Sequence, residues 1–183
     1  MEIAGNQVIL RTMNDQDKDL FLDLSQDVTV TKVTGGYASP KSPMHSIRVF
    51  YSLQNSARHL LCIIADKENP QTGWGMIILS HIDFNYKSAE IYIKLKASAR
   101  NKGYAKDAIN TLVFYAFHEL GLHHLYANIQ EHNIASQKLC EKCGFRQKCL
   151  HQSRTDGYGK PRNIYVYGIT YSPALQRYPA SPD

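Results

Sequence analysis

The sequence predicts an α+β fold: a mixed, mostly antiparallel twisted sheet with helices on both faces and one parallel β-helix-β unit. Three strand-like runs, at 59–66, 73–82 and 88–95, follow one another with only short, turn-rich connections between them. Such connections indicate an antiparallel meander. A further strand-like run at 124–130 is followed by a helical segment and another strand, an order that requires a crossover and places the two strands parallel.

The N-terminal elements are indicated by local signals. Residues 14–26 have the composition of a helix that Asn14 or Asp15 would cap, because acidic residues fill its first turn. The other elements expected before residue 59 are a strand at 7–11, a Gly-, Ser- and Pro-rich surface loop at 34–43 and a helix at 44–57.

The C-terminal half begins with a change from strand to helix periodicity. Apolar residues recur at intervals of three and four from Ala105 to Leu120, and Gly121 stands where a left-handed C-cap is expected. Asn133 is a plausible N-cap for a helix that runs to Lys142 and ends at Gly144. Residues 145–153 and 163–171 complete the chain as a hairpin.

Composition favours an ordinary globular protein. The chain has 183 residues, of which 43% are hydrophobic and 20% charged, so we expect one domain over 1–183 with 173–183 as an extended tail. The longest apolar run, 60–65, is far shorter than a membrane-spanning helix, and the N-terminus lacks a basic segment followed by an apolar one. We therefore expect a cytoplasmic protein that does not enter membranes.

Charge and cysteine content exclude other classes. The net charge of +5 is spread along the chain without a basic block, which makes nucleic acid an unfavoured partner. The four cysteines are too few and too unevenly spaced for a disulfide scaffold, so we expect reduced thiols. Cys140, Cys143, Cys149 and His151 could be mistaken for zinc ligands, but two of them fall in a helix, and we predict packing rather than a metal site.

The stretch "ARNKGYAKD" at residues 99–107 joins a strand to a long helix. Amides at a helix N-terminus lack intrahelical acceptors and favour anions, Gly103 permits close approach of the backbone, and Arg100, Lys102 and Lys106 add positive charge. From these residues alone, a phosphate site and an ordinary turn with one glycine are equally supported.

Four motifs in order resemble the GNAT superfamily of acetyl-CoA-dependent N-acetyltransferases. Arg100-x-x-Gly103-x-Ala105 matches its R/Q-x-x-G-x-G/A motif, and "NIASQKLCEKCGF" is similar to its N-x-x-[AS]-x-x-L-Y-E-K-x-G-F helix. "AEIYI" before the turn and "VILRTMNDQD" near the N-terminus extend the resemblance to residues 7–172. The pattern is closest to the branch of ribosomal-protein N-terminal and polyamine acetyltransferases.

The resemblance implies acetyl-CoA as cosubstrate. It implies that the strands at 88–95 and 124–130 splay apart to admit the pantetheine arm, and that the turn after the first of them holds the pyrophosphate. The residues implied in cofactor binding are Ile93, Lys94, Leu95, Arg100, Asn101, Lys102, Gly103, Tyr104, Ala105, Lys106 and Asn133, although a plain N-cap explains Asn133 nearly as well.

The resemblance also suggests catalytic groups. Glu90 stands where relatives often carry the general base, which takes a proton from the attacking amine, although a solvent-facing glutamate is the alternative. Many relatives use a tyrosine as general acid where this chain has Cys140, and the ribosomal-protein branch uses the serine that corresponds to Ser136. We rank Ser136 ahead of Cys140 and leave water open.

The expected function is direct transfer of an acetyl group from acetyl-CoA to a primary amine, either a small amine or a protein N-terminus. Its main rival is a noncatalytic acyl-CoA-binding or regulatory domain, which the missing tyrosine keeps open. The segments at 26–45 and 154–162 are expected to face the acceptor. Asp23, Asp27 and Asp156 could attract a cationic amine, although scattered surface acids without such a role are the alternative. A homodimer is compatible with the sequence.

Overall fold

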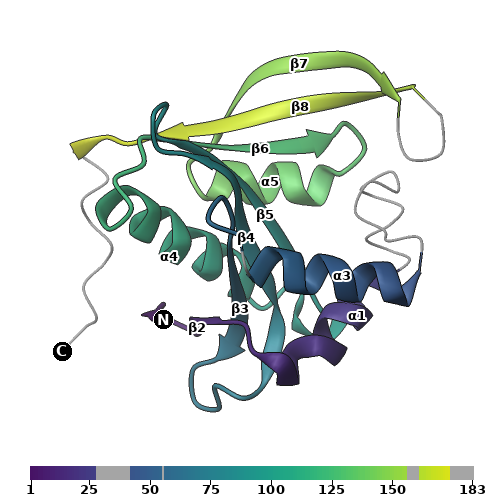
Figure 1. Ribbon diagram of the computed structural model, residues 1–183. Coiled ribbons are helices and arrows are strands. Elements are labelled where there is room, and N and C mark those ends of the chain that lie inside the picture. Colours follow the sequence, from purple (N-terminus) through teal and green to yellow (C-terminus); the bar gives the residue numbers. More distant parts are fainter. Residues whose placement is uncertain (28–41, 55, 156–160, 174–183) are drawn as a thin grey trace.

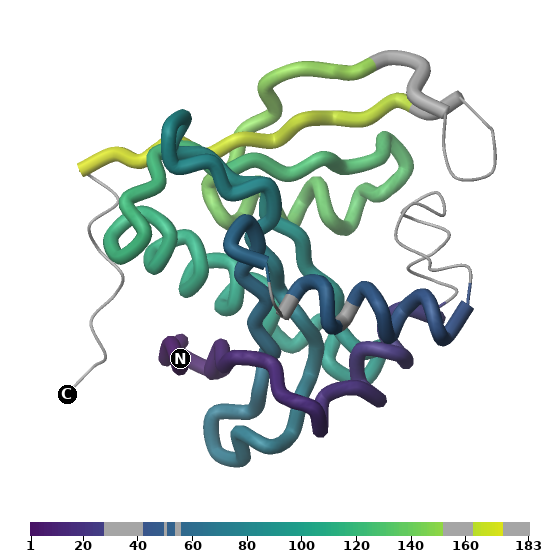
Figure 2. The backbone as a smooth tube through the Cα atoms, viewed as in Figure 1, coloured from purple at the N-terminus to yellow at the C-terminus, as the bar shows by residue number. Residues whose placement is uncertain are grey.

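A computed structural model describes residues 1–27, 42–54, 56–155 and 161–173, and shows one curved sheet with helices on both faces (Figures 1 and 2). Its described strands follow the spatial order β1-β2-β3-β4-β5-β6-β8-β7. They are β1 (Glu2–Ala4), β2 (Val8–Thr12), β3 (Leu60–Asp66), β4 (Gly73–Asp83), β5 (Ser88–Leu95), β6 (His124–Gln130), β7 (Arg146–Thr155) and β8 (Pro161–Thr170). The helical elements are η1 (Asp15–Asp17), α1 (Lys18–Gln26), α3 (Pro43–Gln54), η2 (Ala97–Ala99), α4 (Tyr104–His118) and α5 (Ile134–Lys142).

The predicted α+β mixed sheet is confirmed. Strands β2 to β5 pair antiparallel in chain order, as the short connections required. The hydrogen-bonded parallel pair is β5 with β6, and α4 is its crossover. The second unit, β6-α5-β7, also has parallel strands, but β8 lies between them and pairs antiparallel with both.

Differences from the expected elements are small. The three-residue strand β1 was not predicted; it pairs with β2 at the sheet edge and is too short to show an alternating pattern. The helix expected over 14–26 begins with the η1 turn, whose N-cap is Asn14, and continues as α1. The loop at 34–43 and the tail at 173–183 lie almost wholly outside the described residues.

The sheet buries apolar side chains on both faces. Helices α1 and α3 pack on one face, over a cluster that includes Phe21, Leu24 and Ile63. Helix α4 covers the other face, where Leu112 and Phe117 belong to a larger cluster that also takes residues from α5. A β-strand in such a sheet therefore presents alternate residues to two different helical layers. Among the described helices, none is both long and apolar enough to cross a membrane.

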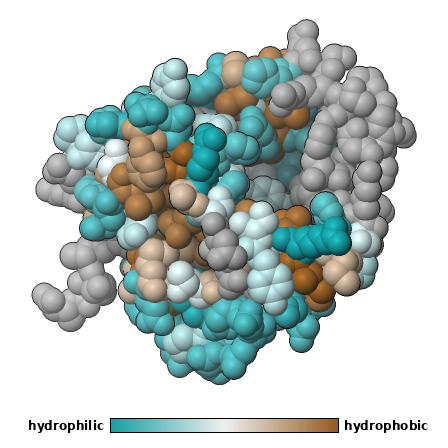
Figure 3. Space-filling view, in the orientation of Figure 1, coloured by the Kyte–Doolittle hydropathy of each residue, from teal (hydrophilic) through white to brown (hydrophobic). Residues whose placement is uncertain are grey.

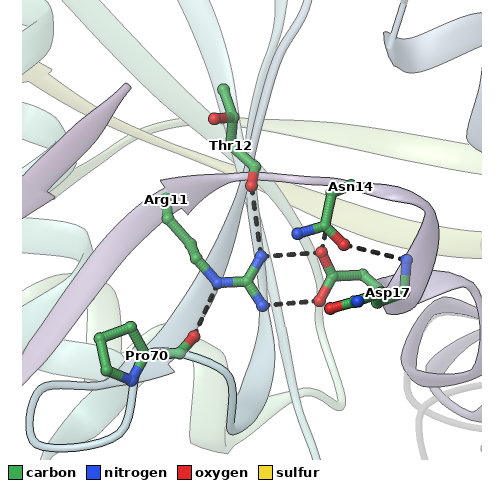
Figure 4. Close-up of polar contacts among 6 residues, drawn as sticks. Arg11, Thr12, Asn14, Asp17 and Pro70 are labelled. Carbon is green, nitrogen blue, oxygen red and sulfur yellow. Dashed lines mark hydrogen bonds and ion pairs between the residues drawn. The ribbon is translucent and has the colours of Figure 1, made fainter.

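A buried ion pair joins β2 to the start of the first helix (Figure 4). Arg11 donates from Nη1 and Nη2 to the two carboxylate oxygens of Asp17, each at 2.7 Å. Arg11 Nε donates to the carbonyl of Pro70 at 2.8 Å, and the amide of Asn14 donates to Asp17 Oδ2 at 2.9 Å. Because every charged atom has a partner, this pair can stay ionised away from water, and it raises the pKa of Arg11.

Candidate active site

Strands β5 and β6 separate after a short paired segment. Their register covers Ser88 with His124, Ala89 with Leu125 and Glu90 with Tyr126, and ends there. Beyond Glu90, residues 91–95 pair with β4 on one side, and no described strand pairs with their other side. Figure 3 shows a hollow in the surface between the part over α3 and the part over β6 and β8. The predicted splay is therefore present, and one backbone edge of β5 faces it.

The turn after β5 places unpaired amides beside this edge. Asn101 and Gly103 have positive φ values of 61° and 89°, so the chain reverses sharply before α4 begins at Tyr104. The amides of the first helical turn lack intrahelical acceptors until Asp107, whose N–H donates to the carbonyl of Gly103 at 3.1 Å. Asn101, Lys102, Gly103 and Lys106 are exposed. The turn therefore has the backbone geometry of an anion site.

A groove continues from this turn along α4. Its volume is about 550 Å³, and Gly103 and Lys106 lie at one end, with Phe114 and Phe117 forming part of its apolar lining. Lys142 reaches the same groove from the end of α5. The sequence did not single out Lys142 as a binding residue, because the two lysines come together only when α5 packs beside α4.

Asp107 fixes the helix start to the N-terminal segment. Its carboxylate accepts hydrogen bonds from the amides of Asn6 at 3.1 Å, Gln7 at 2.7 Å and Val8 at 3.0 Å, and its side chain is buried. The Gln7 side chain in turn lies against Gly103, where an added Cβ would sit 3.2 Å from Gln7 Oε1. Sequence reasoning missed Asp107, which looked like an ordinary acidic residue in a first helical turn.

Arg100 braces the turn from the other side. Its Nε and Nη2 donate to the carbonyl of Leu95 at 3.2 and 3.0 Å, and Nη2 also pairs with Asp27 at the end of α1. Its guanidinium therefore links the turn to α1 as well as adding charge. Asp27, one of the three acids named as able to attract a cationic acceptor, is paired with Arg100 in this way. Asp156 lies outside the described residues, and Asp23 is exposed on α1.

The Lys94 side chain points away from solvent, toward the α1 layer. It is 5% exposed, and its Nζ donates to the carbonyl of Leu24 at 3.4 Å and lies 5.7 Å from the ring centre of Tyr92. Burial lowers the pKa of Lys94 to about 8, while the negative charge of Asp27 acts in the opposite direction. Any contact of Lys94 with a ligand in the gap would therefore come from its backbone, as for its neighbours Ile93 and Leu95.

Glu90 lies at the point where the two strands part. Its Oε1 accepts a hydrogen bond from Asn128 Nδ2 at 2.9 Å, and its Oε2 lies 3.3 Å from Nδ1 of His81. The side chain is 23% exposed, so the carboxylate is neither sunk in the core nor free in solvent. Burial, followed by the charge of Glu90, raises the pKa of Tyr126, which is Glu90's register partner on β6. The carboxylate is thus held in place and remains accessible.

The two candidate acids lie on α5 in different environments. Asn133 caps this helix by accepting from the amide of Ser136 at 3.2 Å, which confirms the predicted N-cap, and Ser136 is half-buried. Cys140 is 5% exposed in the larger core cluster, and burial raises its pKa to about 12. The hydrogen bonds of the described residues tie Glu90 to Asn128, and none joins it to Ser136 or Cys140.

Of the remaining cysteines, Cys143 lines the groove along α4, whereas Cys62 and Cys149 do not. All four thiols are free, as expected, and three are buried while Cys149 is exposed on β7. Among the residues that the structure describes, no three potential ligands cluster as a metal site would require. Cys140 and Cys143 both belong to the core cluster, which is consistent with packing.

Comparison with known proteins assigns this arrangement to a family. The family model described as "Acetyltransferase (GNAT) domain" matches residues 7–146. The uncharacterised N-acetyltransferase YoaA of Bacillus subtilis is 25% identical over 169 residues, covering 91% of this chain and 95% of that protein. The spermidine N(1)-acetyltransferase of Vibrio cholerae is 34% identical over 71 residues, covering 39% of this chain and 41% of that protein.

Solved structures share the fold. The spermidine N-acetyltransferase from Vibrio cholerae in complex with CoA and spermine has a TM-score of 0.80 at 20% identity and covers 90% of this chain and 95% of its own. The microcin C7 self-immunity acetyltransferase in complex with acetyl-CoA and AMP has a TM-score of 0.77 at 17% identity, with 91% and 93% covered. With its splayed strands, its glycine turn and a family match that covers more than half of its length, the chain belongs to the GNAT family of acetyltransferases.

Proposed function

We propose that this chain transfers an acetyl group from acetyl-CoA directly to a primary amine, and that the reaction takes place where β5 and β6 part. The observation that carries the proposal is the unpaired edge of β5 beyond Glu90, which runs toward the exposed amides at the start of α4. When bound, acetyl-CoA would supply an activated acetyl thioester. The backbone of Ile93–Leu95 offers hydrogen bonds to an extended amide-bearing arm, and the amides of 101–106 offer donors to phosphate.

The groove along α4 fits the rest of this cosubstrate. Lys106 and Lys142 on its rim would attract the phosphates of an adenosine nucleotide, and its apolar lining suits a base. A side chain at Gly103 would strain the backbone, which has a positive φ there, and would press against the side chain of Gln7. The side chain of Asn133 caps α5, and we include Asn133 among the proposed cofactor contacts because of the family resemblance.

In this proposal Glu90 is the general base. An alkylammonium must lose a proton before its nitrogen can attack, and a held, partly exposed carboxylate at the strand divergence can accept that proton directly or through water. Ser136 is the preferred source of the proton that the departing thiolate gains, because its hydroxyl can relay a proton from solvent. Cys140 is a weak donor sequestered in the core.

The acceptor is best sought among cationic amines and peptides. Spermidine enters as a candidate because the spermidine N(1)-acetyltransferase of Vibrio cholerae resembles part of this chain, and a serine-initiated peptide represents the protein N-termini. The test is release of free thiol from acetyl-CoA in the presence of each amine. Rapid release with at least one amine supports the proposal.

A noncatalytic acyl-CoA-binding domain is the second candidate. It is favoured by one observation, the buried Cys140 in place of the tyrosine that many relatives use. Tight binding of acetyl-CoA without thiol release for any amine of the panel would support it and overturn the enzymatic proposal.

A further inference from the structure

A histidine with an unusual backbone conformation faces the proposed base. His81 lies near the end of β4, has a positive φ of 52° and carries a side chain that is 68% exposed. Positive φ is uncommon for any residue other than glycine, and it costs about 1 kcal/mol or more. Such conformations persist where the surrounding structure imposes them, and they concentrate at functional sites.

The conformation belongs to a β-bulge that changes which face each residue occupies. The register between β4 and β5 is regular up to Ser80 with Glu90 and then shifts before Asp83. Ile77 and Leu79 point into the α4-side cluster, so regular alternation would send His81 there too. Instead Ile82 fills that cluster and is buried, and the imidazole of His81 is turned to the opposite face, toward Glu90. Bulges commonly re-aim a side chain in this way beside active sites.

Neighbouring residues hold the bulge in this position. The amide of Ile82 donates to the carbonyl of Arg58 at 3.1 Å, and this bond ties the bulge to the segment that directly precedes β3. The ring of His59 lies 6.0 Å from that of His81, and Nδ1 of His59 is 2.8 Å from the hydroxyl of Ser56. Burial and then the neighbouring His81 lower the pKa of His59, which favours an uncharged ring behind His81.

From this geometry we propose that His81 is a positioning residue for the acetyl-transfer reaction, holding the Glu90 carboxylate so that it can accept the amine proton. Nδ1 of His81 lies 3.3 Å from Oε2, and Nδ2–H of Asn128 donates to Oε1. A contact on each oxygen would fix the plane of the carboxylate and leave lone pairs that can accept the proton of the amine. The proposal rests on the proposed function, since it assigns His81 a role only if Glu90 is the base.

The unusual φ makes a sharp test available. His81→Gly removes the imidazole and relieves the backbone strain, so the variant should unfold at a temperature at least as high as wild type. Its kcat in the thiol-release assay, with spermidine and a serine-initiated peptide as acceptors, should fall about tenfold, the equivalent of one hydrogen bond to a charged group. The KM for acetyl-CoA should not change. Lys87→Gly is the matched control, because Lys87 has a positive φ of 49° on the same hairpin and is exposed.

Rescue separates positioning from a structural role. Imidazole added to His81→Gly should restore part of the rate, and His81→Asn, which tolerates positive φ and keeps a donor, should lose less than glycine. In a Glu90→Gln background, His81→Gly should have no further effect. If Glu90→Gln is slow but His81→Gly keeps full kcat, the role of His81 is wrong while the base assignment stands. The positioning role is also overturned if His81→Gly is slow, added imidazole does not restore its rate, and His81→Asn is equally slow. If Glu90→Gln keeps full activity, the base assignment itself fails.

Discussion

Asp107 and Gln7 lie 100 residues apart in the chain and are joined by a 2.7 Å hydrogen bond from the amide of Gln7 to the carboxylate. The Asp107 carboxylate also accepts hydrogen bonds from the amides of Asn6 and Val8, so this one buried side chain anchors the N-terminal segment to the start of α4. Since the Gln7 side chain also lies against Gly103, this link supports the turn that we propose binds pyrophosphate.

Asp107→Asn should lower the free energy of unfolding by about 2–3 kcal/mol, because an amide cannot accept three backbone hydrogen bonds and would bring its own N–H groups toward them. Urea unfolding measures the change. The control is Asp19→Asn, an exposed residue in the first turn of α1, which should change stability by less than about 0.5 kcal/mol. Equal effects of the two substitutions would contradict the anchoring role.

Gly103→Glu should weaken acetyl-CoA binding by about tenfold or more, through backbone strain and repulsion of phosphate. Titration calorimetry with acetyl-CoA measures the affinity. Gly121→Glu is matched for strain, since Gly121 has a φ of 66° and no atom within 4 Å of an added Cβ. Unchanged affinity in Gly103→Glu would remove the turn from the cofactor site.

Glu90→Gln should reduce kcat by about a hundredfold, the usual contribution of a general base, while acetyl-CoA affinity stays the same. Steady-state thiol release and calorimetry together separate the two effects. Glu119→Gln, at the exposed C-cap of α4, should retain wild-type kcat. A variant with full turnover would mean that Glu90 is not the base.

Ser136→Ala and Cys140→Ala distinguish the two candidate acids. We expect Ser136→Ala to lose about tenfold in kcat, and Cys140→Ala to keep its kcat while losing about 1 kcal/mol of stability from the buried site. The reverse pattern would assign the thiol as proton donor. Full activity in both variants would leave water in that role.

Lys94→Met should change how stability depends on pH. The pKa of Lys94 is about 8 in the folded chain and close to its ordinary 10.5 when unfolded, so between these values the unfolded chain holds a proton that the folded chain has released. Wild-type stability should therefore rise with pH relative to Lys94→Met, by about 3 kcal/mol from below pH 8 to above pH 10.5. A constant difference across that range would show that Lys94 keeps its ordinary pKa.

Local periodicity was sufficient to predict most elements. The meander was foreseen from three strand-like runs with short connections, α4 from its helical apolar repeat and α5 from its capping residues, and Gly121 and Gly144 do have positive φ. The site was predicted only where a motif lies within one stretch of sequence, as in the turn at 99–107. The turn is held in place by residues that are distant in sequence. No local pattern predicts that the Asp107 carboxylate accepts hydrogen bonds from the amides of residues 6–8.

His81 shows the same limit in another form. Its alternation with Ile77 and Leu79 predicts a core-facing residue, and only the bulge, which depends on pairing with β5, turns it toward Glu90. The insertion of β8 between β6 and β7 was likewise invisible, since strand order is decided by pairing between distant segments.

Three residue pairs join β5 to β6, and beyond them the two parts of the sheet are not hydrogen-bonded to each other in the described residues. Among the described strands, five lie on the β5 side of this gap and three on the β6 side, and the two groups are hydrogen-bonded to each other at one end only. A ligand that forms hydrogen bonds along the unpaired edge of β5 would occupy the place of a strand between β5 and β6. Acetyl-CoA would then complete the hydrogen bonding of the sheet as well as supply the acetyl group.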